Sequence, residues 1–443
     1  MGLSKSIAAR GWAGFALTAM GALVGCGGTE AASRDPAEDA KLTGPASALI
    51  PGAAPPAKWV DASGRTFVLR GKAAFRVVKP GELKQAAPNP GTAAEAPAAA
   101  SIEDFADRLR PVTVVGEYEY ILEKPDLDTA RAVLAAIQRG PSATPDTEPG
   151  GGRDGRNCCG TDDRTNDRSN TGSTEAPTTF SEIGCSGTMI SPSVLLTAAH
   201  CVYDTVNNAW LQVPTEPSWG SGNRWPRYAH GVDGLDADPA PFTHSGTQSF
   251  DVTKSASGVF STVAPGAYIQ CYDVFITNGF VNASFGGGTD DYALIDFKKR
   301  CNYSPGSITS WWGTWARDTA GITANTAWMY GYPATAQNGA NINSATLTYR
   351  DTSLWSGVYT TGQIWTDNGT PTIDSGATWQ LRYTSIDTTG GDSGAGIYQV
   401  FNGTPRYLIG SHIGVASGDA YNFGRRWDST TSAFATANTV FPN

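Results

Sequence analysis

A change of sequence pattern near residue 158 constrains the fold of this chain more than any other feature. From Cys158 to the C-terminus, helical periodicity almost disappears, and short apolar or alternating runs recur between turn residues. Examples are TMISPSVLLTAA, YIQCYDVFIT, YALIDF, TAWMYGY and RYLIGSHIGV. Many short strands separated by turns are typical of an all-β sandwich or barrel. Residues 158–443 exceed what one small barrel needs, so we expect an all-β domain of two packed barrels.

Residues 26–157 follow a different pattern, which predicts a small, partly disordered α+β region. Segments rich in Ala, Pro, Gly or charge are typical of linkers, and here they are 29–58, 86–100 and 141–157. Segments with the spacing of strands or helices lie between these linkers, at 66–78 and 112–123 for strands and at 102–110 and 127–138 for helices. We interpret this part of the chain as a pro-region.

The first residues predict export from a bacterial-type cell. Lys5 and Arg10 precede an apolar run over residues 11–24, which is shorter than the roughly 20 residues that a helix needs to span a bilayer. We therefore expect a signal peptide over residues 1–25. The sequence Leu-Val-Gly-Cys that ends at Cys26 resembles the lipobox of bacterial lipoproteins, which implies lipidation of Cys26 and membrane attachment through that lipid alone. A plain secretory signal is the alternative.

Composition favours a folded protein and excludes one class of partner. Hydrophobic residues make up 40% of the chain and charged residues 16%, which argues against disorder throughout. Lys and Arg total 32 against 41 Asp and Glu, for a formal net charge of -9. No basic excess remains to bind a phosphate backbone, so we expect no nucleic-acid partner.

The chain has seven cysteines, and an odd number cannot pair completely. With Cys26 assigned to lipid, an even set enters an oxidising compartment where up to three disulfides can form: Cys158, Cys159, Cys185, Cys201, Cys271 and Cys301. Cys271 and Cys301 flank residues 290–297 and are expected to pair, whereas the pairing of Cys158 and Cys159 stays open. No CxxC pair has partner histidines, so we expect neither a metal site nor a cofactor.

Three fragments carry the groups of a nucleophilic catalyst. They are CSGTMISPSVLLTAAHC, DDYALIDF and DTTGGDSGAG, and they contribute His200, Asp291 and Ser393. Serine becomes an effective nucleophile when histidine removes its proton, and a carboxylate orients the imidazole and stabilises its charged form. Asp290 competes with Asp291 for the third role. A protein that keeps these residues on an inactive scaffold is the alternative.

The order His, Asp, Ser resembles that of the chymotrypsin-like serine proteases. The sequence TAAHC around His200 resembles the histidine segment of that family, and GDSG around Ser393 resembles its nucleophile turn. In the family the acid directly precedes a hydrophobic residue and an Ala-Leu-like strand, which fits Asp291 better than Asp290. The resemblance implies a fold of two packed antiparallel six-stranded β-barrels.

The same resemblance assigns further residues. It implies a disulfide between Cys185 and Cys201, because the family has a disulfide of this spacing across the histidine loop. It also implies that the backbone N–H groups of Gly391 and Ser393 form an oxyanion hole.

A closer resemblance is to the glutamyl endopeptidases, the V8-like branch of this family. Residues 160–165 resemble the start of their mature chains, 331–333 resemble a Gly-Tyr-Pro strand segment, and 388–391 resemble the stretch before their nucleophile. In that branch, the residues at the positions that correspond to Thr388 and His412 bind the acidic P1 side chain. The resemblance therefore implies cleavage after Glu or Asp, with a charged imidazole adding attraction.

Two features depart from the family pattern. Arg153, Arg156 and Asn157 all precede possible starts of a mature chain, so the activation cut stays open. The stretch between His200 and Asp291 is longer than the resemblance leads us to expect, and its role also stays open.

Together these observations predict a monomeric, secreted or envelope-anchored serine endopeptidase. The protease domain is expected over residues 158–443, with protein or peptide substrates cut after Glu or Asp. The alternatives are an inactive protease-fold lipoprotein on the cell surface that binds proteins or glycans, and an active serine protease with another P1 preference.

Overall fold

The computed structural model of the chain describes residues 54–61, 64–78, 101–138, 165–166, 177–181, 183–214, 223–226, 228–230, 251–254, 260–263, 272–282, 288–298, 304–306, 311–333, 365–374, 377–400, 406–416 and 421–439. All of them fall in one unit, Gly44–Asn443. None of the helices in these ranges has the length and apolar character needed to cross a bilayer.

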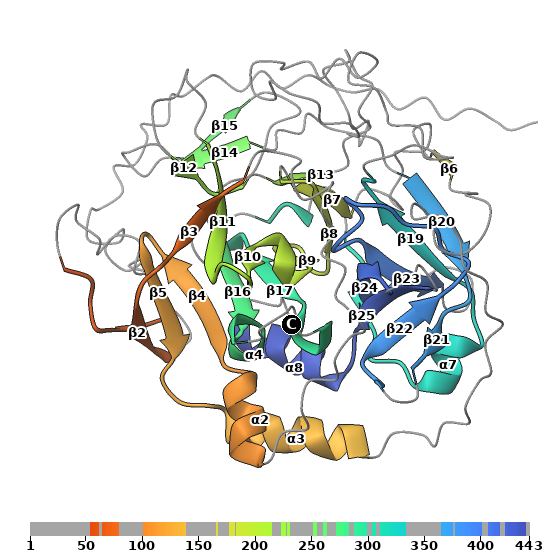
Figure 1. Ribbon diagram of the computed structural model, residues 1–443, viewed down its shortest axis with the longest axis horizontal. Coiled ribbons are helices and arrows are strands. Elements are labelled where there is room, and N and C mark those ends of the chain that lie inside the picture. The colour runs from red at the N-terminus through yellow and green to blue at the C-terminus, as the bar shows by residue number, and fades with distance from the viewer. Residues whose placement is uncertain are drawn as a thin grey trace, which may run out of the picture. The chain divides into compact units, whose positions relative to one another are not determined.

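The first large sheet has ten strands in the order β1-β2-β5-β4-β16-β17-β9-β8-β7-β13, and each neighbouring pair is antiparallel (Figure 1). Its strands are β1 Lys58–Val60, β2 Thr66–Lys72, β4 Pro111–Val115, β5 Tyr118–Leu122, β7 Thr178–Ser181, β8 Cys185–Met189, β9 Val194–Thr197, β13 Tyr228–His230, β16 Asp273–Thr277 and β17 Ala293–Asp296. Every residue of β4, β8, β9 and β17 is buried. These strands are covered on both faces, which explains the mostly apolar sequences of β4, β9 and β17, whereas β8 has the small residues Ser, Gly and Thr at its centre.

The second large sheet follows the order β21-β22-β25-β24-β23-β19-β20-β6, and β18 pairs with β24 in parallel. Its strands are β6 Thr165–Asn166, β18 Gly313–Thr314, β19 Ala327–Gly331, β20 Trp365–Gly369, β21 Thr372–Ile373, β22 Gln380–Tyr383, β23 Gly396–Val400, β24 Arg406–Val415 and β25 Asn422–Arg426. Strand β22 precedes Ser393 and β23 follows it, and both lie in this sheet. The turn that contains Ser393 is therefore anchored at both ends.

Two smaller sheets complete the described strands. In one, β10 Tyr203–Asp204, β11 Ala209–Pro214 and β12 Asn223–Arg224 are joined by β3 Phe75–Val77, which pairs with β11 in parallel. The other is the antiparallel pair β14 Asp251–Lys254 and β15 Phe260–Val263.

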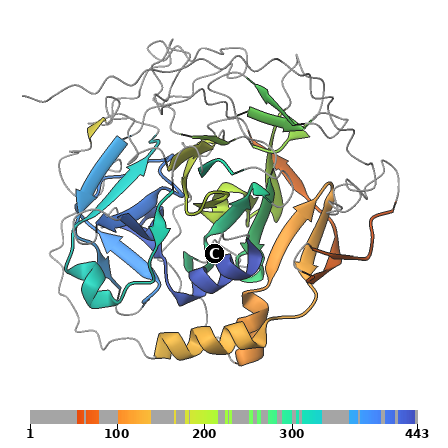
Figure 2. The same cartoon turned by 180° about the vertical axis from the view of Figure 1, so that it is seen from behind.

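The described α-helices are α2 Ile102–Arg108, α3 Leu127–Gln138, α4 Asn278–Val281, α7 Thr319–Thr323 and α8 Ser429–Asn438. Side-chain caps define where several of them begin: Ser101 accepts from the third residue of α2, and Asp428 accepts from two N–H groups of α8. Helix α3 packs against α2 and α8 (Figure 2). These contacts link the N-terminal part of the chain to its last helix.

The expected class is confirmed: the fold is mostly β, with a small α+β region near the N-terminus. The expectation of two closed six-stranded barrels is not met in the described part of the chain, where the two large sheets have open strand orders. Strand β16 shows the reason. It pairs with β17 on one side and with β4 of the N-terminal region on the other, so both of its edges are already used.

Candidate active site

His200 stands on the short 3₁₀ helix Ala199–Cys201, directly after β9. Its ring Nδ1 lies 2.7 Å from Oδ2 of Asp291, and its backbone N–H donates to Oδ1 of the same carboxylate at 3.0 Å. Asp291 precedes β17, which pairs with β9, so neighbouring strands bring the two residues together. Because a carboxylate can only accept here, Nδ1 of the neutral imidazole carries the ring proton. The other nitrogen, Nε2, can then accept a proton.

Asp290, the competing candidate, meets a different partner. Its carboxylate accepts from Nε and Nη2 of Arg108 at 2.6 and 3.1 Å. Burial raises the pKa of Asp290, and the charge of Arg108 acts in the opposite direction. The geometry therefore separates the two aspartates: Asp291 faces the imidazole, and Asp290 faces a guanidinium.

Ser393 lies in the turn between β22 and β23, flanked by two glycines in left-handed conformations. The φ angle is 103° at Gly391 and 86° at Gly394. A Cβ at Gly394 would lie 2.2 Å from the carbonyl oxygen of Ser186 and 2.9 Å from the backbone nitrogen of Ala198. Only glycine meets both the conformational and the spatial requirement at this position. The close approach brings the serine turn against β8 and the residue just before the histidine helix.

Hydrogen bonds from Ser186 on β8 hold this turn. Its N–H donates to the carbonyl of Ser393 at 2.8 Å, and its hydroxyl donates to the carbonyl of Gly391 at 2.8 Å. The same hydroxyl accepts from the N–H of Tyr332 at 2.9 Å. One small buried side chain thus ties the serine turn both to the first sheet and to the end of β19.

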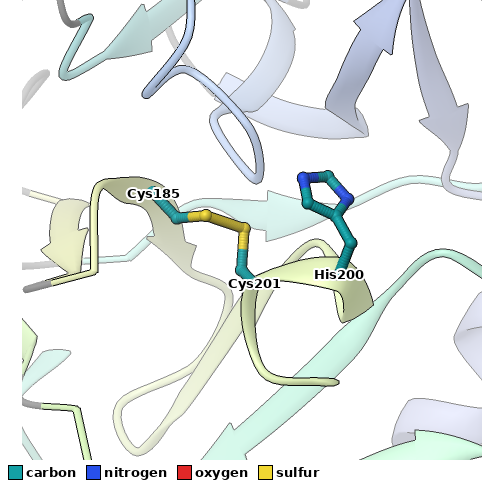
Figure 3. Close-up of side chains that lie close together, drawn as sticks. All are labelled: Cys185, His200 and Cys201. Atoms are coloured by element: carbon teal, nitrogen blue, oxygen red, sulfur yellow. A yellow bond between two sulfur atoms is a disulfide. The ribbon is translucent and has the colours of Figure 1, made fainter. Parts of the chain in front are cut away.

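A disulfide links β8 to the histidine helix. Cys185 and Cys201 are bonded, as the sequence predicts, and Figure 3 shows the bond beside the imidazole of His200. The Sγ atom of Cys201 lies 3.7 Å from the carbonyl oxygen of Ser393. Because this sulfur is in the disulfide and carries no hydrogen, the approach is a packing contact. It places the backbone of the serine turn against the histidine helix.

Cys185, His200 and Cys201 also form a group of three possible metal ligands among the described residues (Figure 3). The disulfide removes both thiolates, which are the forms of cysteine that bind metals. This group therefore does not fit a metal ion. That the protein needs no metal or cofactor stays a prediction.

The N–H groups of Gly391 and Ser393 have no hydrogen-bond acceptor within the described part of the chain. The other N–H groups of the turn are used: that of Asp392 donates to Thr389, and that of Gly394 donates to His412. Two neighbouring unpaired donors beside a serine suit an incoming oxyanion.

His412 lies on β24 next to the serine turn and is 2% exposed. Its Nδ1 lies 2.5 Å from the hydroxyl of Tyr383. Burial, and next the charge of His200, lowers the pKa of His412 to about 3, whereas burial raises the pKa of Tyr383 well above 10. The hydroxyl is therefore the donor, and the neutral imidazole carries its proton on Nε2. Desolvation thus favours the neutral ring in the protein without substrate, and charge attraction between His412 and an acidic P1 group stays a prediction.

Thr388 is buried just before the serine turn. The residue is 1% exposed, and its Oγ1 has no hydrogen-bond partner among the residues that the structure describes. The hydroxyl of Ser411, which precedes His412 on β24, is likewise buried and unpartnered. Orphaned buried hydroxyls carry a desolvation cost that a polar ligand relieves.

Several predicted positions lie outside the described residues. They are Cys26, Cys158, Cys159, Cys271 and Cys301, together with the candidate cut positions Arg153, Arg156 and Asn157. The expected Cys271–Cys301 pair and lipidation of Cys26 stay predictions.

Four residues that shape the site are not marked by any local sequence pattern. Ser186 holds the serine turn, Tyr383 fixes the tautomer of His412, and Arg108 with Arg425 binds the loop before Asp291; Arg425 is buried and donates to the carbonyl of Thr289. Their partners lie far away in the sequence, so no local pattern marks them. The position of Ser186 directly after Cys185 is the one signal that pointed to this region.

Comparison with known proteins agrees with this geometry. The sequence model of the Trypsin family, described as "Trypsin", matches residues 160–222, which include His200. The chain is 25% identical over 276 residues to the "Extracellular metalloprotease" of Bacillus subtilis (strain 168). That match covers 60% of this chain and 64% of the other protein, so the chain spans less than two thirds of its relative's length.

Matching solved structures include a Glu endopeptidase, with a TM-score of 0.40 and 18% identity, covering 63% of this chain and 98% of that chain. The protease Anisep from Arthrobacter nicotinovorans matches with a TM-score of 0.32 and 16% identity, covering 57% and 88% respectively. The match of residues 160–222 to the Trypsin model and the pairing of His200 with Asp291 beside the Ser393 turn both resemble the trypsin-like serine proteases.

Proposed function

We propose that this chain is a secreted or envelope-anchored endopeptidase that hydrolyses peptide bonds after Glu or Asp. The observation that carries the proposal is that the carboxylate of Asp291 accepts two hydrogen bonds from His200, one from the ring Nδ1 and one from the backbone N–H. It lies beside a serine turn with two unpaired N–H donors. This arrangement suits acyl transfer through a covalent intermediate.

In the proposed mechanism, the Oγ atom of Ser393 attacks the substrate carbonyl while Nε2 of His200 takes its proton. Asp291 keeps the imidazole oriented and stabilises its positive charge. The N–H groups of Gly391 and Ser393 bind the negative charge that develops on the carbonyl oxygen. His200 then protonates the leaving amine, and water releases the acyl group by the same steps in reverse.

Thr388 and His412 are proposed to bind the acidic P1 side chain. The unpartnered Oγ1 of Thr388 and the Nε2–H of neutral His412 are donors to a carboxylate. A carboxylate bound next to the imidazole also stabilises its protonated form. Proton uptake by His412 is therefore expected to accompany binding of an acidic substrate.

Labelling with a serine-directed phosphonate tests the nucleophile. The wild-type chain should be labelled, and Ser393→Ala should abolish labelling. A wild-type chain that folds and resists the reagent would support the inactive binding protein instead. Labelling that persists in Ser393→Ala would refute the assignment of Ser393.

Digestion of a peptide library tests the P1 preference separately. We expect cleavage after Glu and Asp, and much slower cleavage of matched peptides in which Gln replaces Glu. Cleavage after Lys, Arg or Phe instead would refute the role of Thr388 and His412 while leaving the nucleophile assignment intact.

Export and processing belong to the same proposal. Residues 1–25 act as the signal, Cys26 carries lipid, and a cut before residue 158 separates residues 26–157 from the protease domain. The printed name of the Bacillus subtilis relative, an extracellular protease, is consistent with export. N-terminal sequencing of the cell-free protein, and loss of lipid labelling in Cys26→Ser, would test these steps.

A further inference from the structure

The N-terminal part of the chain pairs with later strands in two different sheets, in the first large sheet through β4 and in a smaller sheet through β3. We call residues 54–138 the N-terminal segment. Its strand β4 pairs with β16 in antiparallel register, with Val112 opposite Ile276. Its strand β3 pairs with β11 in parallel, with Phe75 opposite Trp210. Figure 1 shows β4 beside β16 and β3 beside β11. A segment that pairs through two strands is held by main-chain hydrogen bonds as well as by side chains.

The N-terminal segment also supplies part of the protease core. Val112, Val114 and Ile121 belong to the same buried apolar cluster as Trp210 and Ile276. A second cluster combines residues of both parts in the same way: Phe67, Val115 and Tyr120 with Tyr292 and Leu294. Removing the segment would expose these side chains to water, at a cost of roughly 25 cal/mol for each Å² of apolar surface.

Polar contacts connect the N-terminal segment to elements near the site. The indole N–H of Trp210 donates to Glu119 at 2.8 Å. The N–H of Asn278 donates to the carbonyl of Arg110 at 2.8 Å, and its side-chain amide donates to Asp107 at 2.9 Å. These bonds fix β11 and the start of α4 to the segment.

The contact of most consequence joins Arg108 on α2 to Asp290. The Nε and Nη2 groups of the guanidinium donate to the two oxygens of the carboxylate, whose side chain is 4% exposed. A buried carboxylate that loses its partner is strongly destabilised. Asp290 directly precedes Asp291, and the carbonyl of Thr289 just before it accepts from Arg425. The loop that presents Asp291 to His200 is therefore held from two sides, and one side belongs to the N-terminal segment.

We propose that the N-terminal segment is a permanent chain of the active molecule, retained without a covalent link after the cut before residue 158, and that Arg108 is a positioning residue for Asp291. This differs from a pro-region that leaves after activation. The retained partner is the segment itself, bound through β3, β4 and α2. The role of Arg108 rests on the proposed function, whereas retention of the segment does not.

Retention of the N-terminal segment is tested by cutting the chain at an engineered protease site. The recognition sequence of a site-specific protease replaces part of residues 141–157 in the full chain carrying Ser393→Ala, which prevents self-digestion. After cutting, the two fragments should elute together in gel filtration under native conditions and separate in concentrated urea. Release of the N-terminal fragment without denaturant would overturn the proposal. This experiment does not depend on activity, so it stays decisive even where the proposed function fails.

The positioning role is tested with Arg108→Gln and a matched control, Arg131→Gln. Arg131 lies on α3 of the same segment, is exposed, and pairs only locally with Asp128. Displacement of a catalytic group by about 1 Å costs roughly 100-fold in rate. We expect Arg108→Gln to lower kcat by roughly 10- to 100-fold with little change in KM, and Arg131→Gln to leave both unchanged.

A second variant keeps this test decisive where Arg108→Gln folds poorly. The double variant Arg108→Gln with Asp290→Asn leaves no buried charge without a partner, so it should recover folding and part of kcat. Full kcat in a folded Arg108→Gln protein would overturn the positioning role. An equal loss in Arg131→Gln, or no recovery in the double variant, would do so as well.

Discussion

At the scale of single residues, two neighbouring aspartates have different tasks. Asp291 binds the ring and the backbone N–H of His200, and Asp290 neutralises Arg108. Their side chains leave the chain in different directions, although the sequence DDYALIDF presents them as near equivalents. This difference can be measured by removing one charge at a time.

Asp291→Asn should lower kcat/KM by roughly 10⁴-fold near neutral pH, because an amide N–H facing Nδ1 favours the wrong imidazole tautomer. Asp290→Asn removes the charge beside Arg108 without touching the imidazole, so its loss should be far smaller. Steady-state kinetics on a Glu-containing peptide measures both. Equal losses in the two variants would contradict the assignment.

His412 makes the stability of the protein depend on pH. Its pKa is lowered to about 3 in the folded state, chiefly by burial, against about 6.5 when unfolded. Between these values the unfolded chain binds a proton that the folded chain does not, so the free energy of unfolding falls as the pH drops through this window. His412→Gln should flatten that decline. Urea unfolding from pH 7.5 to 4.5 in the Ser393→Ala background measures it, and an unchanged slope would contradict a buried neutral histidine.

At the scale of elements, β8 organises the site. Its Cys185 is bonded to the histidine helix, and its Ser186 donates two hydrogen bonds to the serine turn and accepts one from the N–H of Tyr332. The serine turn can lie this close to β8 because residue 394 is glycine and has no side chain. The geometry of the triad therefore depends on how two loops pack against one strand.

Gly394→Ala tests this packing, and Gly64→Ala is its matched control. Both glycines have left-handed φ angles, of 86° and 80°. A Cβ at Gly64 meets nothing within 4 Å, whereas at Gly394 it meets the carbonyl of Ser186 at 2.2 Å. Gly64→Ala should therefore cost only the conformational strain of about 1 kcal/mol. Gly394→Ala should in addition displace the serine turn and lower kcat by roughly 100-fold or more. Similar effects in both variants would show that the close approach is unimportant.

At the scale of the whole molecule, the N-terminal segment and the described residues after 158 share sheets and core. Val112 and Val77 offer a matched comparison, because both are on strands of the segment that pair with the protease domain. Val112 is fully buried, whereas Val77 is 42% exposed.

Val112→Ala should lower the free energy of unfolding by about 2 kcal/mol, and Val77→Ala should change it far less. Urea unfolding followed by tryptophan fluorescence is expected to show one cooperative transition, since both parts form one core. If the N-terminal segment unfolded at a lower urea concentration than the rest of the chain, in a separate transition, the two parts would not share a core.

The sequence by itself determined the β-rich class, the α+β region before it, and the chemical groups of the site. Alternating runs, turn residues and the fragments around His200 and Ser393 are local, so they can be recognised without a structure. Only the tertiary structure shows that Asp290 faces Arg108, that Tyr383 fixes a neutral His412, and that β4 pairs with one edge of β16. Each of these depends on contacts between residues far apart in the chain, on burial that shifts a pKa, and on strand pairing that local patterns do not encode.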